Sequence, residues 1–451
     1  MNKQKYYIKT FGCQMNVYDS NRIANILDNL GYEAASAIKT ADLIIFNTCH
    51  IREKAAEKVF SDLGRALLVK RQRAKEGKDT IIGVTGCVVQ AEDQQIAKRA
   101  PYVDFATGPL TYHRLPEILA KVLRKRGHSI IDTEFPAESK FDFLPENRAS
   151  GGCSFLAIQE GCNNFCTYCV VPYTRGVETS RPIAEILHEA QRLVDTGSFE
   201  LNLLGQNVNS YHGEDNSGKE RSLAYLLHKL AEIDGLKRIR YTTSYPADMT
   251  DELIACHRDL PQLMPYLHLP VQSGSDKILK AMNRRHTRDD YLQIIEKLTA
   301  ANPAIRMSSD FIVGFPGESD EDFEQTLDIV RRVNYIQAFS FKYSKRPGTP
   351  AALMPDQVEE KVKQRRLDIL QEQLSSLQFK FNKETVGKTL PVLFEYKGRQ
   401  SGQLVGRTPY MQNVHVEISK EFLNQIVDIR ITEATVNSLS GITSLPNSKA
   451  S

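Results

Sequence analysis

Three cysteines within eight residues constrain this chain more than any other sequence feature. Cys162, Cys166 and Cys169 form a C-x3-C-x2-C pattern, and the next histidine, His188, lies in a predicted helix. Thiolates at such close spacing bind zinc, copper(I) or an iron–sulfur cluster. Because only three protein ligands are present, one iron of a four-iron cluster would stay open, as in a catalytic zinc site, and could bind a substrate or cofactor. A zinc knuckle is the alternative.

The cellular compartment decides how the eight cysteines are interpreted. No stretch of the 451 residues approaches the ~20 apolar residues of a membrane helix, and the first residues lack a signal peptide's apolar core. We therefore expect a cytoplasmic protein whose cysteines are free thiols, metal ligands or catalytic groups. The net charge of +3 excludes a strongly basic, histone-like protein but allows local basic patches.

The middle of the chain alternates apolar strands with helical patterns. Six such strands suit part of a (β/α) barrel, since a full barrel needs eight. The cysteine triplet directly follows the first strand, which places it on the loop face where such barrels carry out chemistry. The predicted strands are 155–158, 200–204, 238–242, 266–269, 305–313 and 336–343.

A second set of cysteines follows the strands of an N-terminal β-α-β-α-β pattern, whose first helix is predicted over Ser20–Asn29. Cys13, Cys49 and Cys87 each come just after a predicted strand, at gaps of 36 and 38 residues. Parallel strands end at one side of a sheet, so the three thiols can converge there as a second three-ligand metal site. Buried core cysteines are the alternative, but these would fall inside the strands. Cys153 and Cys256 fit neither set and are interpreted as structural.

The C-terminal part reads as a small all-β barrel of OB-like type, because short alternating strands are joined by Gly and Asn turns. Residues from Ser438 onward are rich in Ser, Gly, Asn and Pro, and we expect them to be frayed. Three basic runs, 65–78, 121–126 and 283–288, suit a phosphate backbone, although each could be a solvated helix face. The fold class is therefore α/β with an added β-barrel.

The C-x3-C-x2-C pattern resembles the signature of the radical S-adenosylmethionine (SAM) enzymes. Gly12–Asn16, Asn47–Ala55 and Thr85–Cys87 look like the N-terminal domain of the methylthiotransferases, and Tyr168–Gly176, Ser308–Glu318 and Lys345–Thr349 agree with that family. The tail resembles a TRAM domain, an RNA-binding barrel. The resemblance covers about residues 3–443. It implies an N-terminal domain over 3–120, a linker over 121–147, a radical SAM core over 148–377 and a TRAM domain over 380–443.

The resemblance also implies roles for individual residues. Cys162, Cys166 and Cys169 would hold the SAM-binding [4Fe–4S] cluster, and Cys13, Cys49 and Cys87 an auxiliary [4Fe–4S] cluster. Residues at or near strand ends would contact SAM, although Gly314 could be only a turn glycine and Asn207 only a cap. These expected contacts are Tyr168, Gly205, Asn207, Gln272, Ser273, Asp310 and Gly314.

The closest subgroup methylthiolates C2 of N6-(dimethylallyl)adenosine at position 37 of tRNA. Its expected partners are the isopentenylated anticodon stem-loop, a reductant such as flavodoxin or ferredoxin, and iron–sulfur cluster and sulfur donors; we expect a monomer and no membrane contact. Two alternatives share the chemistry, with threonylcarbamoyladenosine in tRNA or a ribosomal-protein aspartate as substrate. A non-catalytic Fe–S or zinc RNA-binding protein is the alternative from another class.

Overall fold

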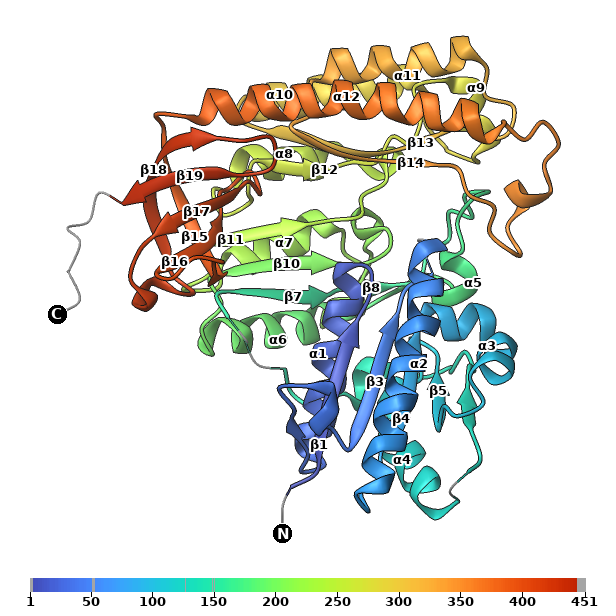
Figure 1. The fold of residues 1–451 in the computed structure, drawn as a ribbon. Helices are drawn as coiled ribbons and strands as arrows, with labels where there is room; N and C mark the ends of the chain where they lie inside the picture. Colours follow the sequence, from blue (N-terminus) through green and yellow to red (C-terminus); the bar gives the residue numbers. More distant parts are fainter. Residues whose placement is uncertain (1–2, 51–52, 126, 148, 150, 444–451) are drawn as a thin grey trace. The chain divides into compact units, whose positions relative to one another are not determined.

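The computed structural model describes residues 3–50, 53–125, 127–147, 149 and 151–443; Ile51 and Arg52 of the 47–55 motif and Arg126 of a basic run lie outside them. The chain forms two compact units (Figure 1). Unit 1 comprises Met1–Asn147, Glu160–Asn163 and Val170–Glu178. Unit 2 comprises Arg148–Gln159, Asn164–Cys169 and Thr179–Ser451. The predicted domain limits stay a prediction.

Unit 1 contains a six-stranded parallel sheet in the order β2-β1-β3-β4-β5-β6. The central strands β3 and β4 are buried along their whole length, as their apolar sequences LIIFNT and IIGVTG require. The strands are β1 (Lys5–Thr10), β2 (Glu33–Ala34), β3 (Leu43–Thr48), β4 (Ile81–Gly86), β5 (Phe105–Thr107) and β6 (Ile130–Asp132).

Helices cover both faces of this sheet. Helices α2 (Glu53–Lys75) and α3 (Cys87–Arg99) pack on one face, and α1 (Gln14–Asn29) and α4 (Leu115–Arg124) on the other. Helix α1 begins at Gln14 rather than at Ser20, where the sequence predicts it. The first turns carry the buried polar side chains of Asn16 and Asp19, which interrupt the apolar pattern.

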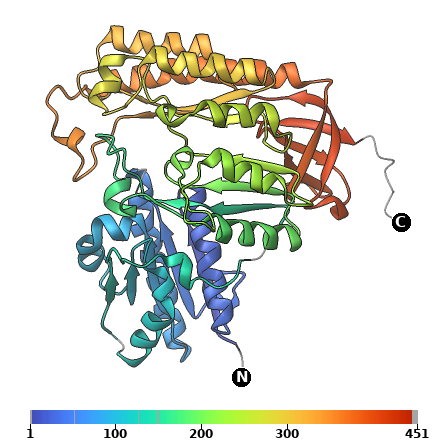
Figure 2. The ribbon, with the colours of Figure 1, turned by 180° about the vertical axis from the view of Figure 1, so that it is seen from behind.

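The central part of unit 2 holds the six predicted strands as two three-stranded parallel sheets, β11-β10-β7 and β12-β13-β14, connected by a bridge between Ile239 and Leu263. Helices lie outside both sheets, over one continuous apolar core (Figure 2). The strands are β7 (Cys153–Ala157), β10 (Glu200–Leu204), β11 (Arg238–Tyr241), β12 (Tyr266–His268), β13 (Arg306–Val313) and β14 (Gln337–Lys342). The helices are α6 (Ile183–Asp195), α7 (Leu223–Ala231), α8 (Asp251–Asp259), α9 (Asp276–Ala281), α10 (Arg288–Ala301), α11 (Asp320–Val333) and α12 (Glu360–Thr385).

A closed five-stranded barrel follows α12, as the OB-like pattern predicts. One expectation is wrong: residues 439–443, predicted to be frayed, form the strand β19, because Leu439 is buried inside the barrel. Buried Arg238 and Arg240 of β11 donate to carbonyl oxygens of Pro391 and Pro409 and so fix the barrel to the preceding sheet. The strands are β15 (Thr389–Lys397), β16 (Gln403–Arg407), β17 (Asn413–Glu417), β18 (Ile426–Ala434) and β19 (Leu439–Thr443).

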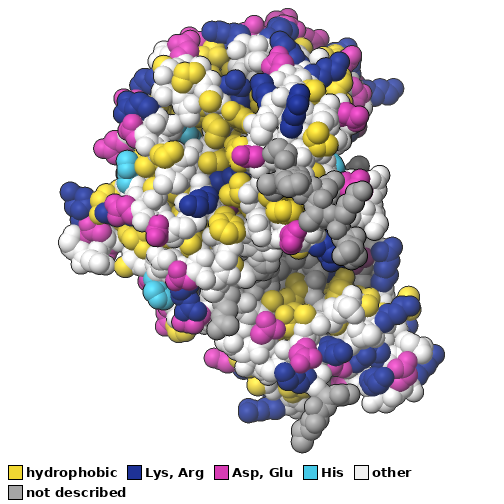
Figure 3. Space-filling model, turned by 90° about the vertical axis from the view of Figure 1, so that its left-hand side faces the viewer, with side chains coloured by type: hydrophobic (Ala, Val, Ile, Leu, Met, Phe, Trp, Pro, Cys, Tyr) yellow, Lys and Arg dark blue, Asp and Glu magenta, His cyan; other side chains and the backbone are white. Residues whose placement is uncertain are grey.

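No helix in the described part of the chain has the length and apolar character needed to cross a membrane. On the face drawn in Figure 3, Lys and Arg side chains alternate with Asp and Glu, so positive charge is not gathered into one patch there.

Candidate functional site

Three cysteines lie at one edge of the sheet in unit 1. Cys13 follows β1 and is the N-cap residue of α1, Cys49 follows β3, and Cys87 follows β4 and begins α3. Strands β1, β3 and β4 are direct neighbours and run parallel, so their carboxyl ends meet at this edge. We call the loops that carry these three cysteines the three-cysteine edge.

Two glycines let the three loops approach one another. Gly12 has φ +99°, and a Cβ there would lie 2.2 Å from Cys49 Cβ and 2.6 Å from Cys49 Sγ. Gly86 has φ +98°, and its Cβ would lie 2.4 Å from the carbonyl oxygen of Thr48. Both positions therefore require glycine for backbone conformation and for space. The loops before Cys13 and Cys87 thus pack directly against the Cys49 loop.

Asparagine side chains brace the same loops. The Asn16 amide donates to the carbonyl oxygens of Phe11 and Thr48 at 2.8 and 2.9 Å, which joins the Cys13 loop to the Cys49 loop. Asn47 donates to the Asn16 carbonyl at 2.8 Å. The Cys13 thiol lies 3.8 Å from Asn16 Oδ1. These buried bonds satisfy the side-chain N–H groups of both asparagines and hold the Cys13 and Cys49 loops together.

A buried ionic cluster lies beside this edge, within unit 1. Arg175, from helix α5 (Val171–Arg175), pairs with Asp19 at 2.7 Å and Glu160 at 2.6 Å and donates to Asn16 Oδ1 at 3.2 Å. Lys140 pairs with the same two carboxylates at 3.2 and 2.6 Å. All four charged side chains are at most 7% exposed. Two cations therefore balance two anions, with Arg175 in contact with the cysteine loops.

The thiols differ in their electrostatic surroundings. A hydrogen bond from Cys49 lowers the pKa of Cys13 to about 6, with help from the Arg175 charge and against the effect of burial. Burial raises the pKa of Cys87, although Arg175 opposes the rise. A cation among thiols favours their thiolate form, which is the form that binds metals.

The residues at this edge suit a thiolate-bound cluster. Within the described residues, no three His, Cys, Asp or Glu side chains are already arranged to hold a metal ion. The ligand chemistry still fits a cluster, since three thiols lie on adjacent loops near the Arg175 guanidinium. Gly12 and Gly86 allow these loops to approach one another closely. Cys13, Cys49 and Cys87 could therefore hold an iron–sulfur cluster with one open iron.

The C-x3-C-x2-C loop is divided between the two units. In unit 1, Gly161 has φ +76°, and a Cβ there would lie 1.9 Å from the Val177 carbonyl oxygen. The Cys162 amide donates to the Gly176 carbonyl oxygen at 3.2 Å. This close backbone pairing fixes Cys162 relative to the segment that carries Arg175.

Cys166 and Cys169 belong to unit 2, where the segment after α9 holds their loop. Asn283 donates to the carbonyl oxygens of Asn164 and Phe165, both at 3.1 Å. The Thr167 amide donates to the Met282 carbonyl at 3.1 Å. Arg284 lies 3.8 Å from Cys166 Sγ and donates to the Pro270 carbonyl at 2.7 Å. A second guanidinium thus lies beside a cysteine of the radical SAM pattern.

The expected SAM contacts lie at carboxyl ends of strands in both sheets of unit 2, with two exceptions. Tyr168 lies in the cysteine loop, packed edge-on against Phe315 at 6.5 Å, and Asp310 lies within β13. Gly205 and Asn207 follow β10, and Asn207 donates to Asp248 at 2.7 Å.

The remaining expected contacts adjoin β13. Gln272 has φ +74°, and its backbone N–H donates to the backbone carbonyl oxygen of Asp310 at 3.0 Å. Gly314 has φ +70° and donates to Glu318 Oε1 at 2.8 Å. Ser273 is buried against Thr326 at 3.4 Å. The structure therefore brings Gln272 to Asp310.

Sequence reasoning assigned no role to the ionic cluster. Asn16 and Asp19 are three residues apart and so share a helix face, which is a usable signal. Lys140 lies in the predicted linker and Glu160 just beyond β7, so only the fold brings them together. Cys153 and Cys256 lie in β7 and α8, and burial raises the pKa of both, to about 11 for Cys256.

Three family matches divide the chain. Residues 5–108 match the uncharacterized protein family UPF0004, residues 156–330 the radical SAM superfamily, and residues 383–443 the TRAM domain. The radical SAM domain implies one [4Fe–4S] cluster and SAM, and the TRAM domain is an RNA-binding module.

Solved structures share the fold. The radical SAM methyltransferase TsrM from Kitasatospora setae matches with a TM-score of 0.57 and 13% identity, over 78% of this chain and 75% of its own. The cobalamin-dependent SAM radical enzyme OxsB matches with a TM-score of 0.51 and 14% identity, over 83% of this chain and 56% of its own. The chain thus has a UPF0004 domain, a radical SAM domain and a TRAM domain in this order, which is the architecture of the MiaB-type methylthiotransferases.

Proposed function

We propose that this chain replaces the C2 hydrogen of N6-(dimethylallyl)adenosine at position 37 of tRNA with a methylthio group. The observation that carries the proposal is the three-cysteine edge, which occurs in one chain with a radical SAM pattern. C2 of adenine offers no acidic proton, so acid–base catalysis has no easy route to it. Hydrogen-atom abstraction followed by sulfur insertion is suited to such a carbon.

In this proposal each cysteine set has its own task. A cluster on Cys162, Cys166 and Cys169 would supply the radical from one SAM, while a second on Cys13, Cys49 and Cys87 would supply sulfur that receives the methyl group of another SAM. Arg284 places positive charge near the first set and Arg175 near the second. Tyr168, Gly205, Asn207, Gln272, Ser273, Asp310 and Gly314 would orient SAM.

The proposed partners follow from the domains. The TRAM domain supports an RNA substrate, which we propose is an isopentenylated anticodon stem-loop. The radical SAM domain needs a reductant, for which flavodoxin or ferredoxin are candidates, and repeated turnover needs sulfur and cluster donors. We place this activity in the cytoplasm, with the protein acting as a monomer.

Mass spectrometry of tRNA nucleosides tests this function. Cells that lack the gene should lose 2-methylthio-N6-(dimethylallyl)adenosine and accumulate N6-(dimethylallyl)adenosine, and the intact gene should reverse both changes. Loss of the methylthio group from threonylcarbamoyladenosine, or from a ribosomal-protein aspartate, would identify one of the alternative substrates instead. Unchanged nucleosides and protein would contradict the proposal.

A further inference from the structure

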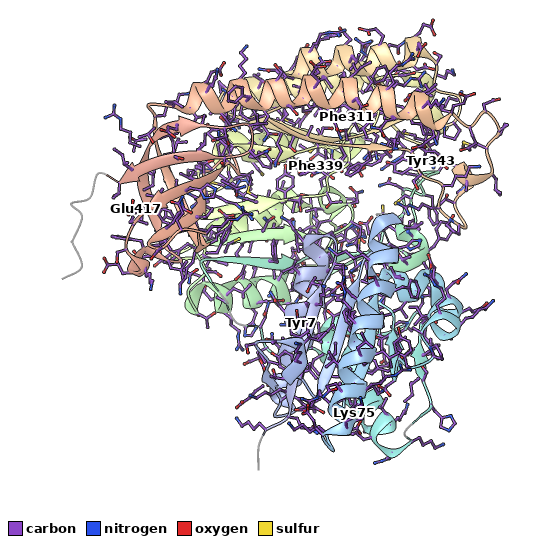
Figure 4. All side chains as sticks on the ribbon, viewed as in Figure 1. Tyr7, Lys75, Phe311, Phe339, Tyr343 and Glu417 are labelled. Atoms are coloured by element: carbon purple, nitrogen blue, oxygen red, sulfur yellow. The ribbon has the colours of Figure 1, made fainter. Side chains whose placement is uncertain are left out.

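The sheet β12-β13-β14 has one face under the helices and one face turned away from them. Met307, Phe311 and Val313 of β13 are buried in the core under the helices. Alternate residues of a strand point to opposite faces, so Ser308, Asp310 and Ile312 lie on the other face. The register pairs Asp310 with Phe339 and Ile312 with Phe341, which puts both phenylalanines on that face. Figure 4 shows Phe339 on the opposite side of the sheet from Phe311.

The side chains of these two phenylalanines on the edge strand β14 are partly exposed to solvent. Phe339 is 43% exposed and Phe341 36%, whereas Phe311 on the helix side is fully buried. Two aromatic rings, two residues apart on one edge strand, form a short apolar strip. Exposed apolar surface of this kind, bordered by polar groups, is typical of a binding face.

Polar groups stand next to the strip. The His268 ring meets the Phe339 ring edge to face at 6.3 Å, and its Nε2 lies 3.6 Å from Asp310 Oδ2. His268 Nδ1 lies 2.9 Å from Ser308 Oγ, and the Tyr266 hydroxyl donates to Gln337 Oε1 at 2.7 Å. Planar apolar surface and hydrogen-bonding side chains therefore occur side by side. A nucleobase is recognised by stacking and edge hydrogen bonds together.

In the other sheet of unit 2, Asn202 of β10 is 1% exposed, and its Oδ1 has no hydrogen-bond partner among the described residues. The register places it beside Phe155 of β7 and Arg240 of β11. Buried carbonyl oxygens without a partner are rare in folded proteins. Asn202 thus offers an unused acceptor within the sheet β11-β10-β7.

We propose that the face formed by His268, Phe339 and Phe341 binds the isopentenylated adenine itself. The purine stacks on Phe339, and the five-carbon alkenyl group packs against Phe341. His268 Nε2, which lies 3.6 Å from Asp310 Oδ2, presents a hydrogen-bonding atom to the edge of the base. The inference rests on the proposed function and assigns the recognition of its substrate.

Charge favours this occupant over the two alternative substrates. Threonylcarbamoyladenosine and an aspartyl side chain both carry a carboxylate, and the Asp310 carboxylate on this face repels a second one. An uncharged alkenyl group meets no such penalty and gains contact with the phenylalanine rings.

Binding of two anticodon stem-loops by the full-length, anaerobically reconstituted protein tests the proposal. One stem-loop carries isopentenyladenosine and the other plain adenosine. We expect Phe339→Ala to weaken binding of both by ~5–150-fold, the range for loss of one base–aromatic stack. Phe341→Ala should lower the preference for the isopentenyl form by ~10-fold and leave binding of the plain form nearly unchanged.

Two further variants separate stacking from folding and from general apolarity. Phe339→Leu keeps apolar volume but removes the ring, and we expect most of the stacking loss to remain. Ile369→Ala on α12 changes a side chain of similar exposure, 42%, on an outer helix and should bind both stem-loops like wild type. Wild type is expected to bind the isopentenyl stem-loop more tightly than the plain one. If both phenylalanine variants keep that preference, the assignment of this face is wrong, while the proposed substrate is not contradicted. Failure of wild type to prefer the isopentenyl form would instead contradict the proposed substrate.

Discussion

The two cysteine sets reach their positions by different routes. The C-x3-C-x2-C set comes from one loop, whereas Cys13, Cys49 and Cys87 come from three loops after three neighbouring strands. The single loop is held mainly by backbone carbonyls and amides, as at Gly161 and Asn283. The three-cysteine edge needs a whole sheet and a buried ionic cluster. A local site is therefore specified by spacing, and a dispersed one by the fold.

Cysteine substitutions should separate the two sets most sharply. Anaerobic reconstitution of wild type should give about eight iron atoms per chain, since each [4Fe–4S] cluster holds four. Cys162→Ala should halve the iron and abolish reductive cleavage of SAM. Cys13→Ala should also halve the iron but retain SAM cleavage to 5′-deoxyadenosine, with no methylthiolated RNA. Iron determination and chromatography of the SAM products would measure these effects.

Cys256→Ala is the matched control, because Cys256 is fully buried in α8 and belongs to neither set. It should leave both the iron content and SAM cleavage unchanged. Zinc in place of iron at either set, or full iron content in Cys13→Ala, would break the assignment of two clusters.

The two guanidiniums offer the next comparison. Arg175→Met would leave Asp19 and Glu160 with Lys140 as their only cation in the described cluster, and we expect a loss of ~3–5 kcal/mol in unfolding free energy. Arg284→Met removes hydrogen bonds to a carbonyl and a thiol, and should cost only ~1–3 kcal/mol. Chemical unfolding of both variants without cluster would measure the difference. Equal losses would show that the ionic cluster does not stabilise unit 1 as the contacts indicate.

A smaller effect is expected from glycine substitutions, which test how closely the loops of the three-cysteine edge pack together. Gly12→Ala adds a Cβ 2.2 Å from Cys49 Cβ at φ +99°, so strain and displacement of the Cys49 loop should together cost ~2–4 kcal/mol. Gly31→Ala has a similar φ of +85° but no atom within 4 Å, and should cost only ~1–2 kcal/mol. Thermal unfolding would rank the two variants. Iron uptake should fall in Gly12→Ala alone, and retention there would contradict close packing of the loops.

The sequence predicted those parts of the molecule whose causes are local. Apolar runs such as 43–48 identify buried strands, and six strands were expected where the two sheets of unit 2 occur. It failed where long-range packing decides the outcome. The strand β19 closes a barrel although its sequence contains Ser, Gly and Thr. Helix α1 begins early because Asn16 and Asp19 have partners elsewhere in the fold. The alternation of a strand puts Phe339 and Phe341 on one face, but only the register places them beside Asp310 and Ile312.

The segment that holds the C-x3-C-x2-C loop also gives a pH-dependent comparison. His286 is buried, and burial together with the nearby Arg284 charge lowers its pKa to about 3. The unfolded chain binds a proton at this imidazole below about pH 6.5, whereas the folded chain does not until about pH 3. The free energy of unfolding is therefore highest above pH 6.5. It decreases as the pH falls, by about 2 kcal/mol at pH 5 because of this one group.

His286→Phe keeps the ring contacts with Tyr245 and Tyr291 but removes the titrating group. Unfolding of the cluster-free protein in denaturant at pH 7.5 and pH 5 should show a smaller loss in this variant than in wild type, by about 2 kcal/mol. His128→Phe, at an exposed position of unit 1, should leave the loss as in wild type. An unchanged loss in His286→Phe would mean that the imidazole is reached by water and that this segment opens more readily than its contacts indicate. A smaller loss of unfolding free energy in this variant would show that water does not reach His286 in the folded protein. The segment that holds the C-x3-C-x2-C loop is then closely packed, as the ionic cluster is beside the three-cysteine edge.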